Sequence, residues 1–129
     1  MSMTAVHKAL YSFWSQFGCA AYLAGHVPDD AEFPYITFSV GAGDALAEDV
    51  LTAFDWHRAE NGVNVNAERA ELMDRIQLAL PPEGRLIEAG EGRLFLYRNG
   101  SSFQSYYDDP EDQAVIGGRT SYIIKFLTI

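Results

Sequence analysis

The chain of 129 residues has room for one domain and is short for two. Its composition, 48% hydrophobic and 13% aromatic, lies outside the range of disordered chains and is sufficient for a core of its own. No apolar run approaches the roughly 20 residues that span a bilayer, and the N-terminus lacks the pattern of a signal peptide. A membrane or secreted protein is therefore not expected, and the single cysteine, Cys19, is compatible with a reducing cytoplasm.

The charge balance is strongly acidic. Eighteen acidic residues face nine basic ones, for a net charge of −9. The basic residues are spread singly, whereas a phosphate-binding surface needs clustered Lys and Arg, so tight binding to nucleic acid or to anionic lipid is not expected. The acids form two groups: Asp29, Asp30, Glu32, Asp44, Glu48 and Asp49, and then Asp108, Asp109, Glu111 and Asp112.

Apolar spacing predicts a helix at the start of the chain, with Thr4 as a candidate N-cap and Gly18 as its stop. Its apolar stripe consists of Val6, Leu10, Phe13, Trp14 and Phe17. A short apolar stretch at 19–24 and the segment Tyr35–Val40 read as strands, the second entered after Pro34. Alternation predicts a further strand over Val50–His57.

The second half begins with the clearest helix, Ala67–Leu80, with Asn66 as its expected N-cap and two prolines as its stop. Asn99-Gly100 predicts a type I′ hairpin between 93–98 and 101–107. After a polar loop at 108–118, the strand Tyr122–Ile129 is apolar on both faces and is expected in the middle of the sheet. Residues 1–129 therefore read as a single α+β domain, a mostly antiparallel sheet with a helix packed on one face and an N-terminal helix.

No catalytic, cofactor-binding or metal-binding residues are assigned. Asp55 and His57 point the same way from one strand, but no third ligand or nucleophile accompanies them, and they are interpreted as a solvated polar face. His7 and His26 are expected on the surface, and Cys19 is expected to be buried and unreactive. The loop at Asp108–Asp112 lacks the ligand spacing of an EF-hand.

The layout of the chain resembles the tail-terminator or minor-capsid type of tail-completion protein of long-tailed bacteriophages and prophages. The resemblance covers most of the chain and lies in the order and spacing of its elements. They are the N-terminal helix, the strand opening Phe33–Phe38, a strand ending in Trp56, the acidic helix Ala70–Leu80, an arginine-bearing strand and hairpin, and the terminal strand Tyr122–Phe126.

The resemblance implies a structural protein, not an enzyme, without a cofactor. Its subunits would form a ring, possibly a hexamer, at the head-proximal end of the tail, after assembly in the bacterial cytoplasm. Its partners would be copies of itself, the tail-tube protein and the head-connector proteins of the head–tail junction, with DNA only in passage. In such a ring, repulsion between like charges lets DNA slide, so the two acid groups are candidates for the lumen or an interface. The helix acids Glu68, Glu71 and Asp74 are expected on the outer, solvated face.

Two alternatives rank behind assembly. One is a small ligand-binding α+β domain whose aromatic sheet forms a pocket. The other is a metal-dependent hydrolase built around Asp55 and His57.

Overall fold

The computed structural model describes residues 3–41, 48–59, 64–90, 92–100, 104–108 and 114–128. Within β6 and at residue 128 it describes the backbone only. The elements in chain order are α1 (Met3–Trp14), the short 3₁₀ helix η1 (Ser15–Phe17), β1 (Ala20–Leu23), β2 (Tyr35–Val40), β3 (Glu48–Arg58), α2 (Val65–Ala79), β4 (Arg85–Ala89), β5 (Gly92–Arg98), β6 (Gln104–Asp108) and β7 (Val115–Thr128).

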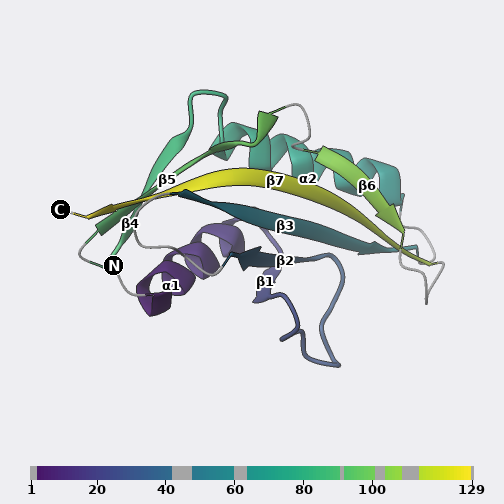
Figure 1. The fold of residues 1–129 in the computed structure, drawn as a ribbon. Helices are drawn as coiled ribbons and strands as arrows, with labels where there is room; N and C mark the ends of the chain where they lie inside the picture. Colours follow the sequence, from purple (N-terminus) through teal and green to yellow (C-terminus); the bar gives the residue numbers. More distant parts are fainter. Residues whose placement is uncertain are drawn as a thin grey trace.

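All described strands join one curled sheet of seven strands (Figure 1). The order is β1-β2-β3-β7-β5-β4, and β6 pairs with β7 beside the end of β5. Among the strand pairs of the described residues, only β1–β2 is parallel. The strand β7 lies between β3 and β5, which confirms the central position predicted from its apolar faces. The α+β class, with a mostly antiparallel sheet, is likewise confirmed.

The predicted hairpin at Asn99-Gly100 is wrong. The strand β5 pairs with β4 and β7, and β6 pairs with β7 rather than with β5. Both β5 and β6 run antiparallel to β7, and the Asn99 amide still donates to the carbonyl of Ser121 (3.0 Å). They are therefore two parts of one interrupted strand. A type I′ turn needs positive φ at both central residues, and only Gly100 has it (58°).

Three predicted boundaries also shift. The N-cap of helix α2 is Asn64 and not the predicted Asn66. The side-chain oxygen of Asn64 accepts a hydrogen bond from the Ala67 amide (3.1 Å). Thr4 lies inside α1, which already includes Met3, so it is not the N-cap. The strand β7 begins at Val115, because the glycines at 117 and 118, interpreted as loop, are buried strand positions.

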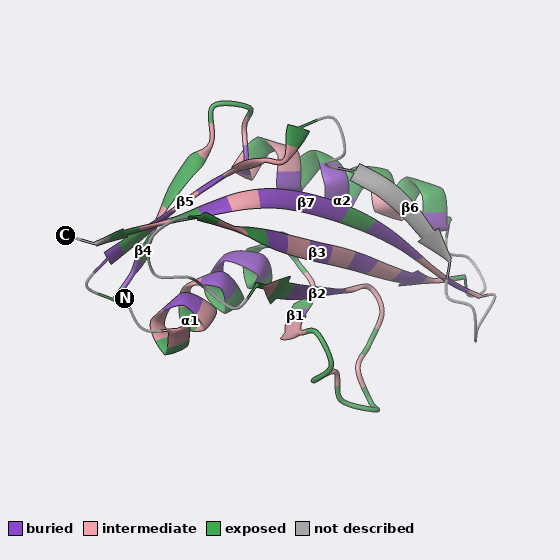
Figure 2. Ribbon diagram, in the orientation of Figure 1, coloured by how far each residue is buried: buried purple, intermediate pink, exposed green. Residues whose placement is uncertain are grey.

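Both helices lie on one face of the sheet. Tyr122 of β7 pairs with Leu51 of β3, both are fully buried, and the Trp14 ring of α1 lies 5.7 Å from that of Tyr122. The same face of β3 carries His57, which bonds to Glu68 of α2. Figure 2 shows the buried side of α1 turned toward the sheet. All five residues of the predicted α1 stripe are buried, and Gly18 ends the helical segment with a φ of 84°.

Candidate functional site

The most distinctive polar arrangement is a buried network on β3. Asp55 and His57 are 5% and 0% exposed, so their interpretation as a solvated face is wrong. Nε2 of His57 lies 2.6 Å from Oδ2 of Asp55, and Nδ1 lies 2.6 Å from Oε1 of Glu68. The two side chains share the face of Leu51 and Ala53, because residues two apart on a strand point the same way.

The helix α2 supplies the other half of this network. Glu68 reaches His57 from its first turn, and Nε of Arg69 lies 3.8 Å from Oδ2 of Asp55. Further along the helix, Arg75 donates to the carbonyl of Phe17 (2.8 Å). These contacts tie α2 to the sheet and to the end of the N-terminal helical segment. The predicted outer position is thus wrong for Glu68, whereas Glu71 and Asp74 are exposed as expected.

The contacts of this network hold α2 against β3. Both ring nitrogens of His57 lie at hydrogen-bonding distance from a carboxylate oxygen, Nε2 from Asp55 and Nδ1 from Glu68. Neither nitrogen is then left for a metal ion, and the ring has no exposed surface on which to meet a substrate. Within the described ranges, no group of three or more His, Cys, Asp or Glu side chains gathers as metal ligands.

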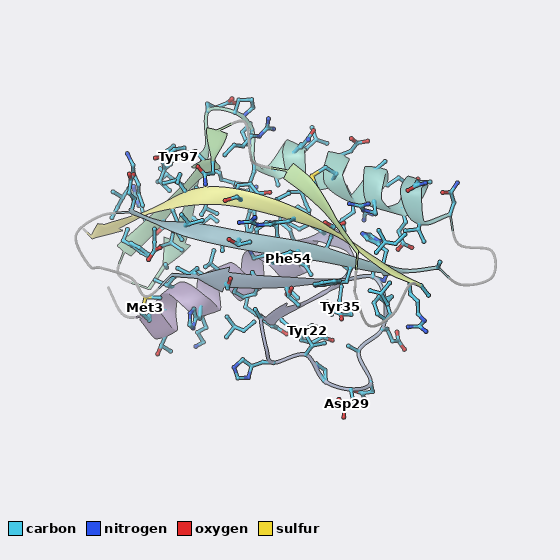
Figure 3. The ribbon with its side chains drawn as sticks, turned by 45° about the vertical axis from the view of Figure 1, so that its right-hand side comes forward. Met3, Tyr22, Asp29, Tyr35, Phe54 and Tyr97 are labelled. Atoms are coloured by element: carbon cyan, nitrogen blue, oxygen red, sulfur yellow. The ribbon has the colours of Figure 1, made fainter. Side chains whose placement is uncertain are left out.

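The opposite face of the sheet is rich in aromatic side chains, and neither of the described helices α1 and α2 lies on it. Phe54 and Trp56 stack on β3, with centroids 5.6 Å apart and planes at 20°. Tyr35 lies beside Tyr22 (5.8 Å) and Phe33 (5.0 Å), and Trp56 Nε1 donates to the hydroxyl of Thr37 (2.9 Å). Figure 3 labels Tyr22, Tyr35 and Phe54 here, with Asp29 beyond them on the β1–β2 loop.

This open face holds a shallow hollow of about 330 Å³, between the aromatic side chains and the start of the β1–β2 loop. Its lining residues are Ala24, Gly25, Val27, Tyr35, Thr37, Phe54 and Trp56. Residues directly opposite each other in paired strands share a face, so the register extends the open face across β7, β5 and β4. Three large apolar side chains are exposed on it: Val50 (40%), Leu86 (52%) and Leu127 (42%).

The structure divides the first acid group. Asp29, Asp30 and Glu32 are exposed on the β1–β2 loop, near the end of the sheet where β2 pairs with Trp56. Glu48 and Asp49 begin β3 at the opposite end. The Glu48 carboxylate accepts from the Tyr97 hydroxyl (3.1 Å) and lies 3.9 Å from Lys125 Nζ, while Oδ1 of Asp49 accepts from the Val50 amide (2.8 Å).

Of the second acid group, the backbone of Asp108 ends β6 opposite Ile116. That position lies at the same end of the long strands as the β1–β2 loop. Asp44, Asp109, Glu111 and Asp112 lie outside the described residues. Along the strands, the backbone of Asp108 lies nearer the β1–β2 loop than that of Glu48 does.

The other residues considered in the sequence analysis, His7, His26 and Cys19, take no part in the network on β3. His26 is exposed as predicted, and His7 is half-buried on α1. Cys19 is half-buried and packs against the core. Burial raises the pKa of its thiol to about 11, although Arg75 acts in the opposite direction.

No protein-family model matches this chain, and no curated protein matches it. Among the described helices, none is long and apolar enough to cross a membrane.

Proposed function

We propose that this chain is a structural subunit that assembles with copies of itself, as a tail-terminator or tail-completion protein at the head-proximal end of a bacteriophage tail. The observation that supports this proposal is the open aromatic face of the sheet. Among the described elements, both helices lie on the other face, and Val50, Leu86 and Leu127 are exposed on the open one. A sheet face with aromatic and apolar side chains that no described helix covers is typical of a protein–protein contact.

The residue types on this face fit a protein partner. Aromatic and arginine side chains are enriched at the centres of protein interfaces, and lysine, aspartate and glutamate are depleted there. Here Phe54 and Trp56 form a stacked pair, Arg58 lies 5.9 Å above the Phe33 ring, and Arg119 is exposed opposite Phe54. The tail-tube protein and the head connector are the partners proposed for it.

The polar chemistry supports assembly over catalysis. The buried side chains of Asp55 and His57 bond to each other and to α2, so the network is best suited to holding the helix on the sheet. The net charge of −9 suits a subunit through whose ring DNA passes without being retained. In the proposed virion tail, the exposed acids Asp29, Asp30 and Glu32 are candidates for the lumen.

Native mass spectrometry over a range of protein concentrations tests the proposal, together with negative-stain images of any assembled species. We expect a closed oligomer, with six subunits as the leading expectation, and rings with a central hole. The protein should also bind the end of tail tubes assembled from the tail-tube protein of the same genome. A protein that stays monomeric at every concentration, both alone and with those tubes, would refute the proposal.

The hollow beside Tyr35, Phe54 and Trp56 favours a second candidate, binding of a small ligand. At about 330 Å³ it is at the lower end of the volumes of ligand pockets. Screening small aromatic compounds while observing the indole N–H of Trp56 by NMR tests this reading. Saturable shifts that disappear in Thr37→Val, which removes the hydroxyl that accepts from the indole, would favour the ligand-binding domain.

A further inference from the structure

A groove of about 910 Å³ lies between the N-terminal helical segment and the edge strand β4. It is bordered by one side of α1 and η1, from Thr4 to Gln16, and by residues 85–90. Two basic residues line it, Lys8 from the helix and Arg85 from the strand, and both are exposed. Arg85 lies 5.6 Å above the Phe13 ring and donates to the carbonyl of Ala79 (3.2 Å). The one acidic residue of the lining, Glu88, pairs with Arg93 (3.2 Å), so the unpaired charge of the groove is positive.

One border of this groove is an open sheet edge. In the part of the chain that the structure describes, β4 pairs with β5 alone, so its other side presents free backbone groups. Such an edge is a template for an added strand, and an extended segment bound there would lie against α1. The five residues of β4 include no proline that would block the pairing.

The segment that complements this groove in charge lies at the opposite edge of the same sheet. The β1–β2 loop carries Asp29, Asp30 and Glu32, all exposed, and none makes an ion pair with a described residue. Figure 2 shows the loop extending away from the sheet, largely exposed. The strand order β1-β2-β3-β7-β5-β4 separates the loop from the groove by the whole width of the sheet, so one subunit does not fill its own groove.

We propose that the groove between α1 and β4 receives the acidic β1–β2 loop of a second copy of this chain. This inference rests on the proposed function and specifies the contact that builds the assembly. The loop carboxylates meet Lys8 and Arg85 beside the open β4 edge. Because the two surfaces differ, the contact is head-to-tail, and each added copy presents a new groove and a new loop. Head-to-tail contacts close into rings when the rotation between neighbours permits it.

Charge reversal tests the pairing. Lys8→Glu and the double variant Asp29→Lys/Asp30→Lys should each raise the concentration needed for assembly by about tenfold or more, since like charges then face each other across the contact. An equimolar mixture of the two should assemble again, because every interface in an alternating ring is then complementary. Asp74→Lys, a charge reversal at an exposed position of α2 away from both the groove and the open face, is the matched control and should assemble as the wild type does.

The outcomes separate this inference from the proposed function. If the wild type forms rings and Lys8→Glu forms them equally well, the groove is not the contact, while the ring proposal stands. If each variant dissociates but the mixture does not reassemble, the acidic loop is not the occupant. If the wild type is monomeric throughout, both proposals fail. Circular dichroism melts of each variant show whether a loss of assembly reflects unfolding.

A crosslink tests proximity directly. In a Cys19→Ala background, Lys8→Cys and Asp30→Cys are made as separate proteins, mixed and oxidised. A disulfide dimer that forms in the mixture faster than in either variant alone supports the contact. Equal rates in all three samples would overturn it.

Discussion

His57 lies within hydrogen-bonding distance of two carboxylates that come from different elements, and its partner Asp55 is only two positions earlier on β3. Oδ2 of Asp55 also faces Nε of Arg69 at 3.8 Å. The buried carboxylate of Asp55 therefore lies between a histidine and an arginine. If α2 separated from the sheet, this carboxylate would lose the arginine and His57 would lose Glu68. This relationship makes the network a determinant of stability.

We expect His57→Ala to lower the free energy of unfolding by about 3–5 kcal/mol, because it leaves the buried Asp55 carboxylate with one fewer partner. Urea denaturation followed by circular dichroism measures the change. His26→Ala, at an exposed loop histidine, is the control and should change stability by less than about 0.5 kcal/mol. Equal, small effects for both variants would show that the network does not hold the helix.

Gly118→Ala should destabilise the protein by about 1–3 kcal/mol, because the added methyl has no space. An ideal Cβ at this position would lie 2.5 Å from Oδ1 of Asp55 and 2.8 Å from Nη2 of Arg69. Gly117→Ala is the comparison on the other face, where the nearest atom, in the Trp56 ring, is 3.1 Å away. The melting temperature should fall further for Gly118→Ala than for Gly117→Ala, and the reverse order would contradict the packing of the network.

Alkaline stability should depend on Tyr122. Burial raises the pKa of its hydroxyl to about 12, from an ordinary value of 10.0. The folded state then holds the proton more tightly than the unfolded state, so this contribution is fully present below pH 10 and is lost as the pH rises toward 12. Two pKa units correspond to about 3 kcal/mol. The stability of the wild type should fall relative to that of Tyr122→Phe over this window, because the other groups cancel in the difference; a difference that stays constant with pH would refute the assignment.

Cys19 should react slowly in the folded protein. With its pKa raised to about 11, the thiolate fraction at pH 8 is about a hundredfold lower than for a thiol with the ordinary pKa of 9.0. The protection is measured as the rate of labelling with a thiol reagent at pH 8, compared between native buffer and about 8 M urea, in which the protein is unfolded. Equal rates in the two conditions would show that the thiol is accessible.

The sequence predicted the elements whose signal is local. The α1 stripe, the strand Tyr35–Val40 and the central position of β7 follow from apolar spacing alone, and each is found where expected. The strand β4 was missed because its sequence, RLIEA, does not alternate between polar and apolar residues. At the sheet edge most of its residues are exposed or half-buried, so no alternation is required. The Asn99-Gly100 hairpin failed because pairing with the long strand β7 overrode the turn signal.

The polar network was harder to predict, although one signal was available. Asp55 and His57 continue the face of Leu51 and Ala53, and a face that begins apolar is more often buried along its whole length. What periodicity could not supply is the partner, because Glu68 and Arg69 come from a helix whose distance from β3 depends on the tertiary fold. The groove between α1 and β4 could not be predicted either, because the sequence pattern did not reveal the strand β4 that borders it.

The central position of β7 has a consequence for the order of events during synthesis. Within the described residues, β1–β3 and β4–β5 share no strand pairing until β7 lies between them. During translation, β1–β3 and β4–β5 therefore emerge from the ribosome before β7 has been synthesised. Until then, β3 and β5 each have an edge whose backbone groups lack their partners on β7. Contacts of such large sequence separation form late and slowly. A nascent chain stalled before residue 115 should accordingly be a substrate for chaperones and should acquire its protease resistance only after β7 emerges.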